Sequence, residues 1–137
     1  MRLTEVVWEW YYYGETEKVV TLYSLGNALV FFSLSAQVQK HSVCGCPFCE
    51  VWYEQCSDVI KFVETLGSFS SPELLTALNQ LTNAFDDLSD EECECGSFDI
   101  FFLSGWEKIR TLSKAALEKL EWDLFLEWDL LDQKKNN

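Results

Sequence analysis

A cysteine-rich stretch in the first half of the chain constrains the fold more than any other feature. Four residues that can ligate a metal ion fall within nine positions: His41, Cys44, Cys46 and Cys49. A second pair, Cys93 and Cys95, follows far along the chain. If both pairs bind one ion, two segments that are remote in sequence must lie side by side. The residue patterns also change at this stretch, from strand-like before it to helix-like after it.

The first forty residues predict β-strands. Residues 4–13 alternate, and β-branched and aromatic side chains at a period of two are typical of a strand. Residues 18–25 and 28–38 resemble this segment, and the turn signals Gly14-Glu15 and Gly26-Asn27 separate the three. Such short connections predict an antiparallel meander. The third strand is apolar on both faces, which predicts a central position.

The rest of the chain predicts helices, with one exception. Apolar residues follow a helical spacing from about Glu50 to Gly67, and Cys56 lies in that stripe as a buried apolar residue. Ser71-Pro72 is typical of a helix start, and Ser104 to Glu107 has the form of a capping box. Residues 98–103 form a short apolar run that favours a fourth strand.

These elements predict an α+β fold in a single domain over residues 1–137. We expect a three-stranded antiparallel sheet, with the possible fourth strand, packed against about three helices and a structural zinc site. Residues 1–40 would form the β-meander, and residues 41–137 the cysteine turn and the mainly helical part.

A repeat near the end of the chain is open to two interpretations. Leu-Glu-Trp-Asp-Leu begins at Leu120, and the same five letters begin again at Leu126. The period of six fits a strand, but no Gly or Pro separates the repeat from the preceding helix, which favours a helix. Such a helix would be apolar on several sides and would need burial on each. A homodimer through residues 120–131 would supply that burial.

The cysteine spacing favours a structural zinc site. Two residues separate Cys46 from Cys49, which lets both thiolates reach one tetrahedral ion, and Cys93 and Cys95 supply a plausible second pair. Cys44 or His41 could replace one of these four. Because His41 is the only histidine, a catalytic site with several His ligands is excluded. Ordinary free thiols are the alternative without a metal.

The four residues from Cys46 to Cys49 also resemble the dithiol motif of glutaredoxins. That resemblance implies a thiolate nucleophile at a helix N-terminus, and hence a thiol oxidoreductase that uses Cys46 and Cys49. The glutaredoxin fold needs a cis-proline facing the dithiol, whereas the only other proline here, Pro72, begins a predicted helix.

The charge distribution narrows the kinds of partner. The net charge is −13, and residues 71–99 contain eight acidic residues and no Lys or Arg. Such a field repels nucleic acid and anionic lipid and attracts basic surfaces. The candidate partner-binding residues are Asp86, Asp87, Asp90, Glu91 and Glu92, joined by Tyr11 and Tyr13 because tyrosine anchors interfaces.

We find no complete catalytic signature, no signal peptide and no membrane-spanning run, and we expect a cytoplasmic protein. The sequence therefore predicts a non-enzymatic inhibitor that binds a basic surface of a nucleic-acid-handling enzyme or toxin. Phage anti-defence proteins and immunity proteins have that character. The alternatives are a zinc-stabilised structural or adaptor subunit that forms a homo-oligomer, and the thiol oxidoreductase.

Overall fold

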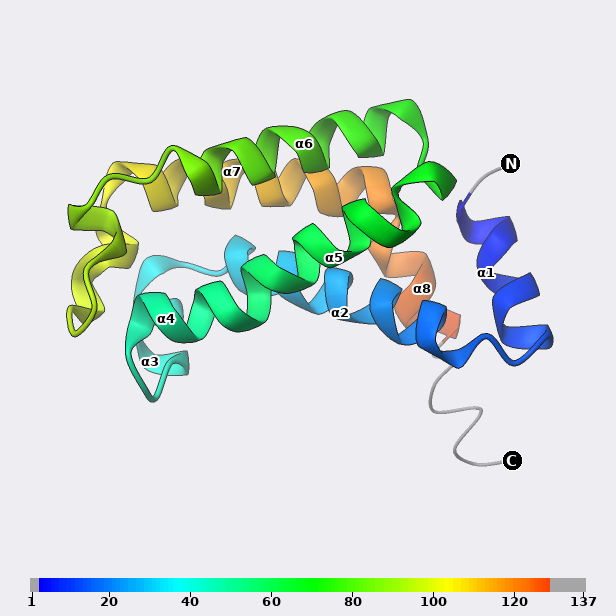
Figure 1. Ribbon diagram of the computed structural model, residues 1–137, viewed down its shortest axis with the longest axis horizontal. Coiled ribbons are helices and arrows are strands. Elements are labelled where there is room, and N and C mark those ends of the chain that lie inside the picture. Colours follow the sequence, from blue (N-terminus) through cyan, green and yellow to red (C-terminus); the bar gives the residue numbers. More distant parts are fainter. Residues whose placement is uncertain (1–2, 129–137) are drawn as a thin grey trace.

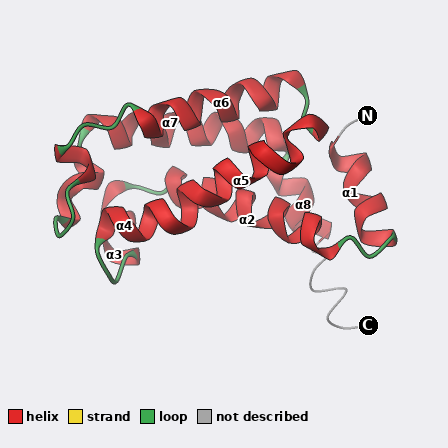
Figure 2. Cartoon of the chain, viewed as in Figure 1, coloured by secondary structure: helices red, strands yellow, loops and turns green. Residues whose placement is uncertain are grey.

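The computed structural model describes residues 3–128, and every regular element in this range is a helix (Figures 1 and 2). The α-helices are α1 (Leu3–Tyr12), α2 (Thr16–Ser33), α3 (Ala36–Ser42), α4 (Pro47–Val51), α5 (Ser57–Leu66), α6 (Pro72–Asp86), α7 (Ser104–Leu120) and α8 (Trp122–Trp128). The π-helical turn η1 (Trp52–Cys56) joins α4 to α5, and three 3-10 turns complete the fold: η2 (Gly67–Phe69), η3 (Glu91–Cys93) and η4 (Phe98–Phe102). The predicted α+β fold is therefore wrong.

The first predicted strand, residues 4–13, is wrong because its buried residues follow a helical spacing. Leu3, Val6, Val7 and Trp10 form the buried stripe of α1. Trp8 and Tyr12, which the strand would have placed beside Trp10, are 41% and 81% exposed. The alternation arose because the outer face of α1 also carries large aromatic residues.

The second and third predicted strands, residues 18–25 and 28–38, are also wrong. Helix α2 contains all of the second and the first half of the third, and the remainder enters α3. Leu22, Leu25, Leu29 and Phe32 are fully buried at intervals of three and four residues. Helix α2 packs against both α5 and α7 (Figure 1). Burial on several sides places apolar residues around most of a helix, which hides its period in the sequence.

Gly26, a predicted turn residue, lies inside α2, where it admits a neighbouring side chain. A Cβ atom at this position would overlap the ring of Trp122 in α8. The hydroxyl of Tyr23 donates a hydrogen bond to the carbonyl of Phe125, 3.0 Å away, beside the same contact. Gly26 therefore lets α8 approach α2 closely.

The helical interpretation of the terminal repeat is confirmed for Trp122–Trp128. Glu121 separates α8 from α7 with a left-handed backbone (φ 60°), a break for which the sequence has no Gly or Pro signal. Residues 129–131 of the repeat lie outside the described residues.

Three predicted helices are confirmed, and one of them is α7. The chain is helical from Pro47 to Leu66, and Cys56 is fully buried within it. Helix α6 begins as predicted, with the Ser71 hydroxyl accepting a hydrogen bond from the Leu74 amide at 3.1 Å. The predicted strand at 98–103 is wrong, since η4 occupies this segment and buries Ile100 and Phe101.

A buried polar network fixes the short elements against α7. The Arg110 guanidinium donates hydrogen bonds to the carbonyls of Leu34 and Phe101 and to Oε1 of Gln39, at 2.8 to 3.1 Å. Gln39 is 1% exposed, and its amide donates to the last carbonyls of α2. The end of α2, α3 and η4 are thereby held together, and the loops that carry the cysteines extend from them.

We expect Gly26→Ala to destabilise the protein, although alanine favours helices. The added methyl group forces the Trp122 ring out of its site, and overpacking of this kind costs about 1–3 kcal/mol. Denaturant unfolding measures the change. The control is Asn27→Ala, an exposed neighbour in α2, which should be neutral or stabilising. Equal effects of the two substitutions would contradict the packing described here.

Candidate metal centre

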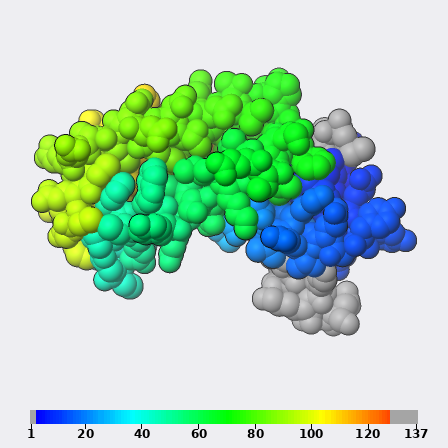
Figure 3. Space-filling model, viewed as in Figure 1, coloured from blue at the N-terminus to red at the C-terminus, as the bar shows by residue number. Residues whose placement is uncertain are grey.

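Three cysteine thiols from two remote segments meet at one end of the molecule. The Sγ atoms of Cys46, Cys49 and Cys95 all lie within 4.8 Å of one another, and those of Cys49 and Cys95 are 3.1 Å apart. In Figure 3 the segments around residues 46 and 95 adjoin at the surface. Cys46 and Cys49 are half-buried and Cys95 is exposed.

The start of α4 positions the first two thiols. Cys46 is the residue before the helix, Pro47 occupies its first turn, and Cys49 follows three positions later on the same side. The Glu50 carboxylate accepts hydrogen bonds from the amides of Cys44 and Gly45, at 3.1 and 2.9 Å. These bonds hold the turn that brings the chain into α4.

The third thiol comes from the loop between η3 and η4. Cys95 is followed by Gly96, whose φ of +93° is a conformation that glycine adopts without strain. The chain therefore turns immediately after Cys95, and this turn keeps the thiol beside α4.

The three thiols perturb one another electrostatically. Hydrogen bonds from the Cys49 backbone, and then from the Cys95 thiol, lower the pKa of Cys46 to about 7. Hydrogen bonds with Cys49 and Cys46 raise the pKa of Cys95 to about 12. One thiolate thus forms readily, and further negative charge is opposed. A bound cation would remove that opposition, so the cluster can hold a metal ion.

The other predicted ligands lie outside this group. Cys93 is not among the clustered thiols, and burial, followed by the charges of Asp90 and Glu92, raises its pKa. Cys44 is exposed, and His41 is exposed with its Nε2 atom 2.8 Å from the Gln37 amide nitrogen. Within residues 3–128, no fourth Cys, His, Asp or Glu joins the cluster. A tetrahedral ion held here would keep one position for water or an added ligand.

Glu92 is a structural residue that the sequence grouped with the partner-binding acids. It is 9% exposed, and its carboxylate accepts hydrogen bonds from the Ser89 amide at 3.0 Å and from the Gly105 amide. Its carbonyl accepts a hydrogen bond from the indole of Trp106 at 2.9 Å. Glu92 therefore binds the N-terminus of α7 and is not available to a partner.

This arrangement replaces the predicted capping box. Leu103, not Ser104, is the residue before α7, and it makes no side-chain capping bond. A Cβ atom at Gly105 would overlap the Glu92 carboxylate, so glycine is required for the contact. Because the accepting carboxylate lies thirteen residues before Gly105, no local sequence motif predicts this hydrogen bond.

The remaining predicted partner-binding residues differ in accessibility. Asp86, Asp87, Asp90 and Glu91 are exposed, and together they form what we call the acidic tip. Tyr13 is 74% exposed. Tyr11 is half-buried and packs edge to face against Trp8, with ring centroids 6.3 Å apart.

Comparisons with protein-family models, with curated proteins and with solved structures found no match. No helix within residues 3–128 is long and apolar enough to cross a membrane. Functional arguments therefore rest on the residues of this chain.

We expect Glu92→Gln to lower the free energy of unfolding at neutral pH by about 1.5–3 kcal/mol, because it removes charged hydrogen bonds. Hydrogen bonds from the Ser89 backbone lower the pKa of Glu92 in the folded protein. The stabilisation is thus complete above the ordinary pKa of glutamate, about 4.3, and is lost as the pH falls through the lowered value. Denaturant unfolding at several pH values should show the two proteins converging in acid. Glu91→Gln, at an exposed neighbour, is the control; a pH-independent deficit for Glu92→Gln would contradict this role.

Proposed function

We propose that this protein is a non-enzymatic binding protein in which a structural zinc ion fixes the acidic tip for contact with a basic protein surface. The observation that carries the proposal is the convergence of Cys46, Cys49 and Cys95, because Cys95 belongs to the segment that carries the tip. The proposed partner is a nucleic-acid-handling enzyme or a toxin with a basic surface, which this protein would inhibit.

Zinc suits the cluster because thiolates are its preferred soft ligands. Between the end of α6 at Asp86 and the start of α7 at Ser104, the chain has only the short turns η3 and η4. A metal bond from Cys95 to α4 would restrict this segment. Three thiolates and one Zn²⁺ carry a net charge of −1, so the ion would leave the local field negative.

The acidic tip is suited to steering a basic partner. Its four carboxylates are exposed and make no ion pair within residues 3–128, whereas nearby Asp99 is paired with Lys40 at 2.8 Å. Exposed charges of one sign accelerate association with an oppositely charged surface and are screened by salt.

The adaptor alternative rested on the terminal repeat. The terminal repeat predicted an oligomer because its aromatic residues needed burial, but Trp122 and Phe125 are buried within the chain itself.

The oxidoreductase alternative is favoured by the pKa of Cys46, about 7. Disulfide exchange with a small-molecule disulfide tests it: a Cys46→Ser variant that reacts as fast as the wild type would exclude it.

We expect one zinc ion per chain in native mass spectrometry, and loss of that ion in Cys95→Ser. The matched control is Cys93→Ser, two positions away, which should retain zinc because Cys93 lies outside the cluster. A chelator should lower the melting temperature of the wild type and of Cys93→Ser, and should leave that of Cys95→Ser unchanged. Absence of zinc from the wild type, or equal losses in the two variants, would contradict the structural zinc site.

Neutralising the acidic tip (Asp86→Asn, Asp87→Asn, Asp90→Asn and Glu91→Gln) should weaken binding of a polylysine probe about tenfold at low salt. The control neutralises four exposed acids elsewhere and has the same net charge: Glu54→Gln, Glu64→Gln, Glu118→Gln and Asp123→Asn. Calorimetry at low and physiological ionic strength measures both. Equal weakening in the two variants would show that net charge, and not the tip, governs binding.

A further inference from the structure

A groove of about 880 Å³ lies between α1 and the segment that joins α5 to α6. Within residues 3–128, its walls combine acidic and aromatic side chains with one cation: Glu9, Trp10, Tyr13, Glu15, Lys18 and Phe69. In Figure 1 helix α1 and the segment that carries the acidic tip lie at opposite ends of the long axis. The groove shares no residue with the metal centre or the tip.

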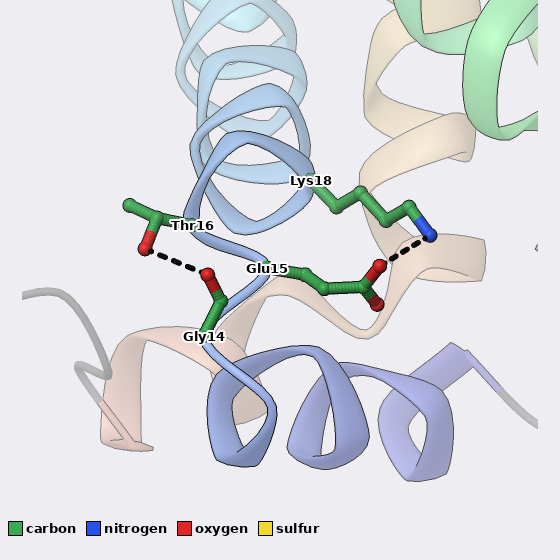
Figure 4. A network of polar contacts seen from close by, with 4 residues as sticks. All are labelled: Gly14, Glu15, Thr16 and Lys18. Atoms are coloured by element: carbon green, nitrogen blue, oxygen red, sulfur yellow. Dashed lines mark hydrogen bonds and ion pairs between the residues drawn. The ribbon is translucent and has the colours of Figure 1, made fainter.

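The groove already holds a cation of the chain itself. The Lys18 ammonium lies 6.0 Å from the ring centroid of Trp10 and 5.7 Å from that of Phe69. Those two rings meet at nearly a right angle, with an interplanar angle of 88° and centroids 5.2 Å apart. The ammonium also pairs with the Glu15 carboxylate at 3.0 Å, as Figure 4 shows. Two aromatic faces and a carboxylate thus form a site for a positive charge.

The interactions that hold the Lys18 ammonium in this site are weak. Its distances to the rings are near the outer limit of about 6 Å for a cation–π contact. The side chains of Lys18 and Glu15 are 37% and 44% exposed, and an exposed pair of this kind contributes little to stability. An incoming cation could therefore displace the lysine at low cost.

Among residues 3–128, the groove lining carries more carboxylates than the ammonium of Lys18 compensates. Glu9 projects from α1 along the groove, and Glu15 lies at its end. This charge disfavours phosphate-bearing ligands and favours a basic peptide. Arginine suits the site better than lysine, because its planar guanidinium stacks on an aromatic face and donates two hydrogen bonds to one carboxylate. Tyr13, exposed at the rim, can cover the aliphatic part of the side chain.

From these contacts we propose that the groove binds an arginine side chain of a basic segment in a partner protein. The guanidinium takes the place of the Lys18 ammonium between Trp10, Phe69 and Glu15. The proposal is independent of the function proposed for the acidic tip, since the two surfaces lie apart.

The probe is the peptide acetyl-Gly-Arg-Arg-Gly-amide, titrated into the full chain and followed by calorimetry and by backbone amide chemical shifts. Lys18→Met should raise its affinity about fivefold, because the internal competitor is removed. Lys114→Met changes the net charge equally from an exposed site on α7, and it should change the affinity less than about twofold. Equal gains in the two variants would overturn the proposal.

Variants at exposed positions test the groove without disturbing the core. Glu9→Gln and Tyr13→Ala should each weaken peptide binding about threefold or more, and the neutralised tip should bind the peptide as the wild type does. A peptide with citrulline in place of arginine, which has the same shape without the charge, should not bind. Binding of the citrulline peptide, unchanged affinity in both groove variants, or chemical shifts confined to the acidic tip would each overturn the proposal.

Discussion

Burial of α2 on several sides is the constraint on which the rest of this structure depends. Helices α5 and α7 pack against it directly, and α8 reaches it because Gly26 leaves room for Trp122. The burial of the apolar side chains around α2 contributes to the driving force for folding. Once these helices are placed, Arg110 and Gln39 bind the carbonyls at the end of α2 and so fix α3 and η4. The positions of the short elements therefore depend on the packing of the long helices.

Two of the contacts that hold the segment between α6 and α7 act at different points of it. Glu92 binds the amides at the start of α7, while Cys95 lies among the thiols of α4. The four carboxylates of the acidic tip lie on the α6 side of both contacts. Like charges in one segment repel each other, and this repulsion disfavours a compact conformation. The ordered path of this segment therefore requires such contacts, which explains why a buried carboxylate and a cluster of thiols occur so close together.

The sequence predicted the features of this fold that depend on local chemistry. Ser71-Pro72 begins α6, the stripe that contains Cys56 is buried, and the first cysteine pair lies at a helix start. It failed where burial on several sides removes the polar residues that reveal a helical period, as in α2. Gly26 added to the error, because a glycine that admits a tryptophan ring and a glycine in a turn are indistinguishable by sequence alone.

The structural roles of Glu92 and Gln39 were not predicted, because their hydrogen-bond partners are remote in the chain. The sequence could not show which of Cys93 and Cys95 joins the thiol cluster, because the backbone path brings only Cys95 to α4.

The two ends of the molecule use negative charge in different ways. At the acidic tip the carboxylates are exposed, so the interaction proposed for them with a partner would be long-ranged and weakened by salt. In the groove beside α1 the carboxylates stand next to aromatic rings, where a cation gains from both. The first arrangement favours rapid encounter with any basic surface, and the second favours one side chain over others. A partner whose basic segment reached the groove would therefore be selected by shape as well as by charge.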